Sequence, residues 1–269
     1  MNLAELCAAL PETRGKPPGL PGRLLGAFRR KSITFCTGVT DERTAVFWFQ
    51  SHTFTIDLRL PDGAATAVAE RQGWIGDTVW DRRKREMSWN VIRSCQARNQ
   101  WPEPARFRFI GNSVLEFAPS GAYVEDWRRQ AGDGPLLGLR LLEGGSRPSA
   151  PMHPMVGGLI LAGGRMAWAC GRPAGPFEVS VATDGRRIDH TTRPDRHGQP
   201  LPGGHFEIAG DGTVTLERSD GNGPARLRFA VDACLKRQPC TGETRTTRAA
   251  REWLDRERGH LARHAVVIA

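Results

Sequence analysis

The sequence contains no run of about 18 apolar residues, which is the length that a membrane-spanning helix needs. Its longest apolar stretches are interrupted by arginine or glycine within a few positions. The first 15 residues include Glu5 within their apolar part and have no basic region ahead of it, so they predict a short amphipathic helix and not a signal peptide. We therefore expect a folded cytoplasmic protein with no membrane partner.

Motifs for metal, redox or nucleotide chemistry are also missing. The six cysteines include no CxxC pair, so we expect them to be reduced and mostly buried. His190, His197 and His205 share one loop-rich stretch, but their spacing matches no compact metal-ligand motif. There is no GxSxG or GxxxxGK(S/T) motif, and the glycines of residues 157–164 lack the strand and helix setting of a nucleotide loop. We expect neither a metal nor a cofactor.

Lysine is rare, with four lysines beside 34 arginines. The formal net charge of +9 would ordinarily suggest a nucleic-acid partner. The basic residues are spread through the chain, however, and the densest run, residues 82–85, falls where we expect a hairpin turn. We interpret the charge as a solvated surface and expect no nucleic-acid partner.

What the sequence does contain is a succession of short segments rich in Val, Ile, Phe, Trp and Thr. Gly, Pro, Asp and Asn separate them at intervals of roughly 8–12 residues, which is typical of antiparallel sandwiches and barrels. This pattern predicts an all-β fold with helices only in the first ten residues and in 244–264. The expected strands are 32–38, 44–50, 53–60, 71–80, 86–94, 105–110, 114–117, 122–128, 136–143, 157–162, 165–172, 177–183, 187–192, 205–209, 213–218 and 225–231.

The strands fall into two sets, 32–142 and 155–231, on either side of the Pro/Gly/Ser-rich residues 143–154. We expect residues 1–31 to be a helix with a flexible segment, 32–231 to be the β domain, and 232–269 to be a helical tail. One barrel made from both sets is as economical as two small domains, because a half sheet exposes open edges unless it closes. The apolar stripe of the tail helix predicts a lid or brace against the β body.

Alternation along two predicted strands separates their faces. In residues 53–60 the even positions are all apolar, whereas the odd positions are polar and end with Asp57 and Arg59. In residues 122–128 the odd positions are Tyr123, Glu125 and Trp127. These three side chains form either a solvated face, with Glu125 paired to an arginine, or the lining of a barrel cavity that binds a small molecule.

Aromatic composition favours the cavity. Tyr123 is the only tyrosine among 20 Phe, Tyr and Trp residues, and it stands two positions from Glu125. A general acid beside a base is therefore conceivable at this place. Five of the eight tryptophans fall between residues 73 and 128 and could form aromatic walls, although each could equally serve plain packing.

Several segments together resemble a known family. They are VFWFQSHTFTIDLRLP (46–61), RQGWIGDT (71–78), LEFAPSGAYVEDWRR (115–129) and LILAGGRMAWACGRP (159–173). In this order they resemble the calycin-like Hri family of fungal proteins and its bacterial relatives. The resemblance covers residues 32–231 and implies a lipocalin-like antiparallel barrel assembled from two related halves, without a settled reaction. Trp89-Asn90 stands where the family commonly has Trp-His, so no histidine role is expected there.

The leading hypothesis is a calycin-like protein that binds a small hydrophobic or aromatic ligand in a polar-aromatic cavity. The expected ligand-binding residues are Arg59, Arg71, Trp89, Glu116, Trp127 and Arg172. The second hypothesis is a cofactor-independent cyclase, isomerase or dehydratase that uses Tyr123 and Glu125 as its acid-base pair and could belong to a biosynthetic pathway. The third is a protein-interaction module without a cavity.

The cavity hypothesis makes one demand on the structure. If Glu125 points into the barrel, its carboxylate needs a cationic partner, because an unpaired buried charge costs several kcal/mol. The candidates are Arg59, Arg71 and Arg172, each of which lies on a predicted strand.

Overall fold

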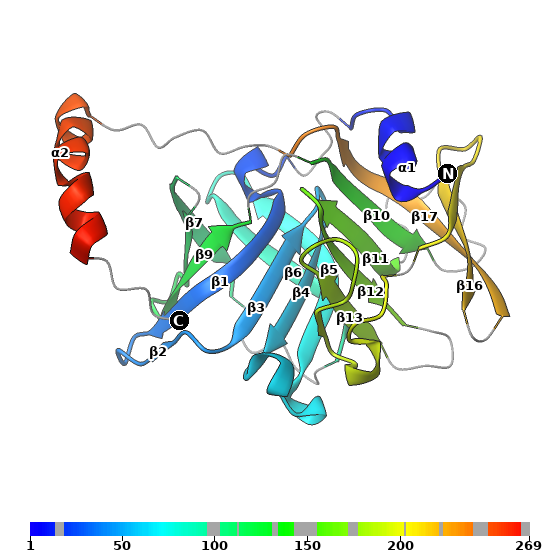
Figure 1. Cartoon of the computed structure of the whole chain (residues 1–269), viewed down its shortest axis with the longest axis horizontal. Helices are drawn as coiled ribbons and strands as arrows, with labels where there is room; N and C mark the ends of the chain where they lie inside the picture. The colour runs from blue at the N-terminus through cyan, green and yellow to red at the C-terminus, as the bar shows by residue number, and fades with distance from the viewer. Residues whose placement is uncertain are drawn as a thin grey trace.

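The computed structural model describes residues 1–13, 19–95, 103–111, 113–130, 134–142, 155–171, 177–201, 203–220, 223–238 and 247–264. Within these residues it contains two antiparallel sheets and two α-helices (Figure 1). Four short 3-10 helices lie in the connections, at Gly22–Leu24, Gly63–Ala65, Val68–Glu70 and Pro194–Arg196.

The first sheet closes into a barrel of eight strands, because β9 pairs antiparallel with β1. The strands of this ring, in order, are β1 (Gly26–Phe35), β3 (Ala45–Gln50), β4 (Phe54–Leu60), β5 (Gln72–Asp81), β6 (Glu86–Ser94), β7 (Ala105–Ile110), β8 (Ser113–Phe117) and β9 (Tyr123–Arg129). The two-residue strand β2 (Thr40–Asp41) pairs with the end of β1 outside the ring. Closure removes the open edges that a sheet of this length would otherwise expose.

The second sheet is open and has eight strands among the described residues. In order across the sheet they are β14 (His190–Thr191), β13 (Glu178–Ala182), β12 (Arg165–Cys170), β11 (Met155–Ala162), β10 (Leu136–Leu142), β17 (Gly223–Leu235), β16 (Val214–Asp220) and β15 (His205–Ile208). Helix α1 (Leu3–Ala9) begins with a capping box between Asn2 and Glu5. Its Leu6 joins a core cluster on the second sheet with Trp168 and Phe229.

The apolar face of β4 points out of the barrel and packs against the second sheet. Phe54 and Ile75, on the outside of the barrel, lie against Gly158 of β11, where an added Cβ would come within about 3 Å of both side chains. Only glycine allows the two layers to approach this closely. The layers are also joined by polar contacts, since Ser51 donates a hydrogen bond of 2.6 Å to the buried Asp232. Because the apolar side chains of β4 are buried between the two layers, the side chains that point into the barrel can be polar.

The structure confirms the all-β class, the antiparallel barrel and the two terminal helices. Most strand boundaries lie within two residues of those expected, but β2 was not expected and three strands differ by more. Strand β17 continues to Leu235, beyond the expected end at residue 231. Strand β1 begins at Gly26 instead of residue 32. The basic run Arg29-Arg30-Lys31 interrupts the apolar pattern from which the start was predicted. The strand nevertheless continues through this run, and Arg30 is buried inside the barrel. The expected strand 187–192 is reduced to β14, which has two residues.

The two strand sets take different places in the fold. Strands β1 to β9 close the barrel by themselves, with β2 outside the ring, whereas β10 of the first set joins the strands of the second set in the sheet that covers β3–β6 on the outside. The sequence left open whether both sets form one barrel or two small domains. The structure instead has a closed barrel and an open sheet that share a core. The apolar outer face of β4 supplies the reason, because it needs a second layer to exclude water.

Helix α2 (Arg248–His264) does not have the position of a lid or brace. Figure 1 shows it standing apart from the barrel, and Trp253, on its expected apolar stripe, is 50% exposed. Arg248 and Glu252 pair with each other on the exposed helix surface. The helix is dominated by such charged residues, so it has too little apolar surface to stabilise docking.

Candidate functional site in the barrel

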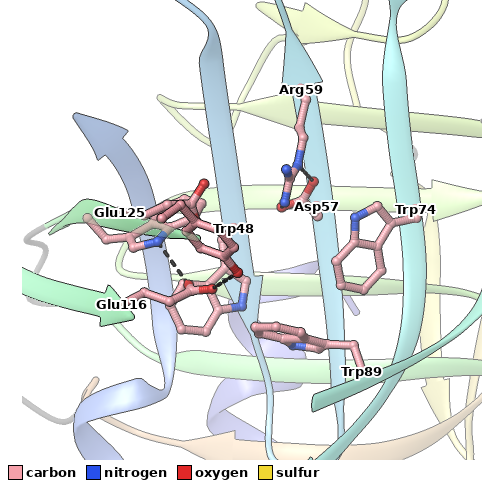
Figure 2. A pocket seen from close by; sticks show the side chains of 9 residues that line it. Trp48, Asp57, Arg59, Trp74, Trp89, Glu116 and Glu125 are labelled. Atoms are coloured by element: carbon pink, nitrogen blue, oxygen red, sulfur yellow. Dashed lines mark hydrogen bonds and ion pairs between the residues drawn. The ribbon is translucent and has the colours of Figure 1, made fainter. Parts of the chain in front are cut away.

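A cavity of about 30 Å³ lies inside the barrel. Figure 2 shows its lining, which comes from six strands and consists of Trp48, Asp57, Arg59, Trp74, Trp89, Glu116, Tyr123, Glu125 and Trp127. Alternate residues of a strand point to the same side, so every second residue of a barrel strand can face the cavity. The volume has room for about two water molecules.

Four tryptophans form the aromatic walls. Trp48 of β3 lies at their centre, with its ring centroid 6.3 Å from that of Trp89 and 5.5 Å from that of Trp127, both in edge-to-face geometry. Trp74 meets Trp89 in the same manner at 6.2 Å. Edge-to-face contacts of this kind hold aromatic rings in fixed orientations. The walls are therefore rigid surfaces with defined faces.

The polar end of β4 places an ion pair in the cavity. Arg59 Nε donates a hydrogen bond of 2.8 Å to Asp57 Oδ1, and Asp57 is almost completely buried. Burial by itself would lower the pKa of Arg59, but attraction to Asp57 and then to Glu125 outweighs it and raises that pKa. The guanidinium therefore stays charged and is held by its neighbour two positions away.

Glu125 also has a cationic partner, but it is none of the expected arginines. Arg30 Nη1 donates to Glu125 Oε1 at 2.8 Å, and Nη2 of the same side chain donates to Asp41 at 2.7 Å. The prediction that Glu125 pairs with Arg59, Arg71 or Arg172 is thus corrected. The reason is the barrel closure, which brings β1 beside β9 and places Arg30 opposite Trp127.

Glu116 and Glu125 are directly opposite each other on β8 and β9. Glu116 accepts hydrogen bonds from Trp127 Nε1 at 3.1 Å and from the Tyr123 hydroxyl at 3.4 Å. Burial and, next, the charge of Glu125 raise the pKa of Glu116 well above its ordinary value. Burial also raises the pKa of Tyr123, with Glu116 as the second cause. Glu116 therefore favours its neutral form, whereas Glu125 beside it is paired with Arg30.

The structure brings most of the predicted site residues together. Those that line the cavity are Arg59, Trp89, Glu116, Tyr123, Glu125 and Trp127. Arg71 instead donates hydrogen bonds to the backbone carbonyls of Thr66 and Thr191, at 2.9 and 2.7 Å, beside a separate hollow of about 260 Å³ near His190. Arg71 precedes β5, so the alternation of that strand does not direct it into the barrel. Arg172 lies outside the described residues.

Four residues of the site were not predicted as site residues, namely Arg30, Trp48, Asp57 and Trp74. A signal exists for Asp57, which stands on the polar face of its strand with Arg59. Trp48 lies in a run whose residues are all buried, so alternation cannot separate its faces. Arg30 follows Arg29 and precedes Lys31, and this basic run resembles a solvated surface.

In the part of the chain that the structure describes, no group of three or more His, Cys, Asp or Glu side chains is arranged to hold a metal ion. The described helices include none with the length and apolar character needed to cross a membrane. Asn90, next to Trp89, is exposed and does not line the cavity.

Comparison of the chain with protein-family models, curated proteins and solved structures found no match. The class of the protein therefore comes from its fold and its cavity. It is an antiparallel β-barrel protein whose eight-stranded closed barrel is consistent with a calycin-like or lipocalin-like fold. Such a fold is compatible with ligand binding.

Proposed function

We propose that this protein binds a small molecule in the barrel cavity, with Arg59, Trp89, Glu116 and Trp127 among the binding residues. The observation that carries the proposal is the polar lining of an otherwise enclosed barrel, in which Glu116 and Glu125 are both buried. Buried ionisable groups cost free energy, and apolar side chains of similar size would fill the same space at less cost. A carboxyl with a perturbed pKa inside a cavity, as Glu116 is, is a typical mark of a functional site.

The size of the cavity limits what it can hold. Ligand pockets for drug-sized molecules have volumes of about 300–1,000 Å³, whereas this cavity is near 30 Å³. A ligand therefore either places only a small polar head group between the tryptophans or displaces one of their rings. The expected hydrophobic or aromatic part of the ligand would then lie along the aromatic walls, toward the rim.

Acid-base catalysis is the second candidate, and the opposed pair of Glu116 and Glu125 favours it. A buried carboxyl with a raised pKa, such as that of Glu116, can hold a proton and donate it in a reaction. The Tyr123 hydroxyl lies beside Glu116, so Glu116 takes the place of Glu125 as the partner of Tyr123 in this hypothesis. The activity would be a cofactor-independent lyase or isomerase reaction.

Membership of the calycin-like Hri family is part of the proposal. The order of the resembling segments supports it, as does the barrel to which the first three contribute. Residues 46–61 supply most of β3 and all of β4, residues 71–78 supply most of β5, and residues 115–129 supply most of β8 and all of β9. A cytoplasmic location and a role in a biosynthetic pathway are likewise proposed from the sequence.

Ligand binding can be tested by intrinsic tryptophan fluorescence, because four tryptophans surround the cavity. A panel of small neutral, cationic and anionic molecules should include members that change the emission saturably. Glu125→Gln should weaken that response while the thermal unfolding remains cooperative. Glu86→Gln is the matched control, since Glu86 is a buried carboxylate of the same barrel that pairs with Arg106 outside the cavity lining. If no member of the panel changes the emission, or if both variants respond like the wild type, the cavity is not a binding site.

A further inference from the structure

The carboxyl groups in and beside the cavity outnumber the guanidinium groups. The carboxyl groups are those of Asp41, Asp57, Glu116 and Glu125, and the guanidinium groups are those of Arg30 and Arg59. Asp57 and Arg59 neutralise each other, while Arg30 is shared by Glu125 and Asp41. Among the ion pairs of the described residues none includes Glu116, which is only 4% exposed. This side of the cavity therefore carries carboxyl groups in excess of cations.

The tryptophan walls, like the excess of carboxyl groups, attract positive charge. The face of a tryptophan ring carries partial negative charge and attracts cations, most strongly where water is excluded. Trp127 uses its ring nitrogen to contact Glu116, and Trp89 donates its own to Thr55 at 3.1 Å. The polar edges of these two rings are thus already engaged. Their remaining surfaces offer π-electron density beside Glu116, which has no ion-pair partner among the described residues.

We propose that the ligand of this cavity is a small organic cation whose protonated amine lies between Glu116, Glu125 and the tryptophan faces. This inference rests on the proposed binding function and adds the chemical class of the ligand. Aromatic rings combined with carboxylates are the means by which proteins recognise ammonium groups. An ammonium group also matches the small volume of the cavity, because it is about as large as the water that it would replace.

Figure 2 separates the two charged regions of the cavity. Arg59 and Asp57 lie together on one side, and Glu116 and Glu125 lie on another side near Trp48. The Arg59 guanidinium donates a hydrogen bond to Asp57, which offsets much of its charge toward an incoming cation, and Glu125 and Glu116 also attract it. A carboxylate ligand would have to compete with Asp57 for Arg59 and would face Glu125 at the same time. Anions are therefore disfavoured.

The raised pKa of Glu116 is the expected property of a carboxyl that lacks its cation. Its proton takes the place of the missing positive charge, and a bound amine would release that proton. We therefore expect amine binding to tighten as the pH rises through the raised pKa of Glu116, as long as the amine itself remains protonated. The titratable and charged groups that act on Glu116 are Glu125 and Tyr123 on β9 and Arg59 on β4. Asp57 also lines the cavity, and Arg30 on β1 pairs with Glu125.

The test uses three molecules of similar size and different charge, namely n-propylammonium, 1-propanol and propionate. Each is titrated into the whole 269-residue chain, and binding is followed by tryptophan fluorescence and by calorimetry in two buffers of different ionisation enthalpy. We expect n-propylammonium to bind at least about tenfold more tightly than 1-propanol, with release of a proton, and propionate to bind more weakly than either. If the alcohol or propionate binds as tightly as the amine, the site binds small molecules but the cation assignment is wrong. If none of these probes and no member of the wider panel binds, the proposed function fails as well.

Two variants place the effect at named residues. Glu116→Gln keeps the shape of the side chain and its acceptor for Trp127, so it should fold, and it should weaken n-propylammonium at least about tenfold without weakening 1-propanol. Trp89→Phe keeps an aromatic ring with a weaker attraction for cations and should weaken the amine several-fold. Glu86→Gln should leave all three affinities unchanged. Loss of amine and alcohol binding in equal measure in the first variant would overturn the proposal.

Discussion

Arg30 lies between Glu125 and Asp41, at 2.8 and 2.7 Å, and all but a small part of its side chain is buried. A guanidinium group suits this place because it offers separate nitrogens to two carboxylates in a fixed plane. Arg30 therefore provides both of these ion pairs of the barrel by itself. The hydrophobic stem of the same side chain can still pack along the barrel wall.

We expect Arg30→Met to lower the free energy of unfolding by about 3–5 kcal/mol, because it leaves the buried Glu125 without its counter-charge. Glu125→Leu should cost less, about 2 kcal/mol, since Arg30 retains Asp41. Arg43→Met is a control on an exposed pair and should change stability by less than about 1 kcal/mol. Urea unfolding measures all three, and equal effects of Arg30→Met and Arg43→Met would contradict a buried ion pair at Arg30.

The raised pKa of Glu116 has a stability consequence with a definite sign. The folded state binds the proton more tightly than the unfolded state, so the contribution of Glu116 is fully present below its unfolded pKa. It is lost as the pH rises from about 4.3 toward the raised folded value. Glu116→Gln cannot ionise, so the variant should become progressively more stable relative to the wild type over that interval. Thermal unfolding across the pH range checks this, and a constant difference between the two proteins would refute it.

At the scale of elements, the pairing of β1 with β9 and the packing of β11 on the barrel decide where the site lies. The first contact closes the ring and joins Arg30 to Glu125. The second covers the apolar outer face of β4, so that the polar face of that strand is left for the interior. Each contact brings together strands that are far apart in the sequence.

Gly158→Val tests the packing between the layers. The added Cβ would lie 2.9 Å from Phe54 and 3.0 Å from the carbonyl oxygen of Leu139, so strands or side chains must shift. We expect a loss of about 1–3 kcal/mol in the free energy of unfolding. Gly210→Ala is the control, because a Cβ added there would meet no atom within 4 Å and should have little effect. Similar denaturation midpoints for the two variants would show that the layers do not approach closely at Gly158.

At the scale of the whole molecule, the described residues form a closed barrel, an open sheet on its outside with helix α1 packed on that sheet, and the separate helix α2. The barrel and the sheet share core residues and are also joined by the ion pair between Arg140 and Asp77. A core shared in this way should make the two sheets unfold together, in one cooperative transition.

Removal of residues 248–269 should leave the melting temperature of the remaining chain within about 2 °C, because the exposed Trp253 contributes little buried surface to the β body. Binding to the barrel cavity should also persist. Calorimetry of the full and shortened chains measures the first effect and fluorescence titration the second. A decrease of more than about 5 °C would mean that α2 stabilises the barrel.

The residues of the sequence determined the strand positions, the terminal helices and the polar face that carries Asp57 and Arg59, as well as the line of Tyr123, Glu125 and Trp127. These features follow from the local alternation of side chains along a strand, which is readable in any short segment. The same alternation explains why most of the predicted site residues meet in one cavity.

Only the tertiary structure decided which strands close the barrel and which side chains become partners. Arg30 and Glu125 are 95 positions apart, and their strands are joined by backbone hydrogen bonds that leave no signature in the side chains. The same is true of the second sheet, which turned the apolar face of β4 outward and left the polar face for the cavity. Alternation shows that a strand has two faces, but the packing of distant strands decides which face lies inside.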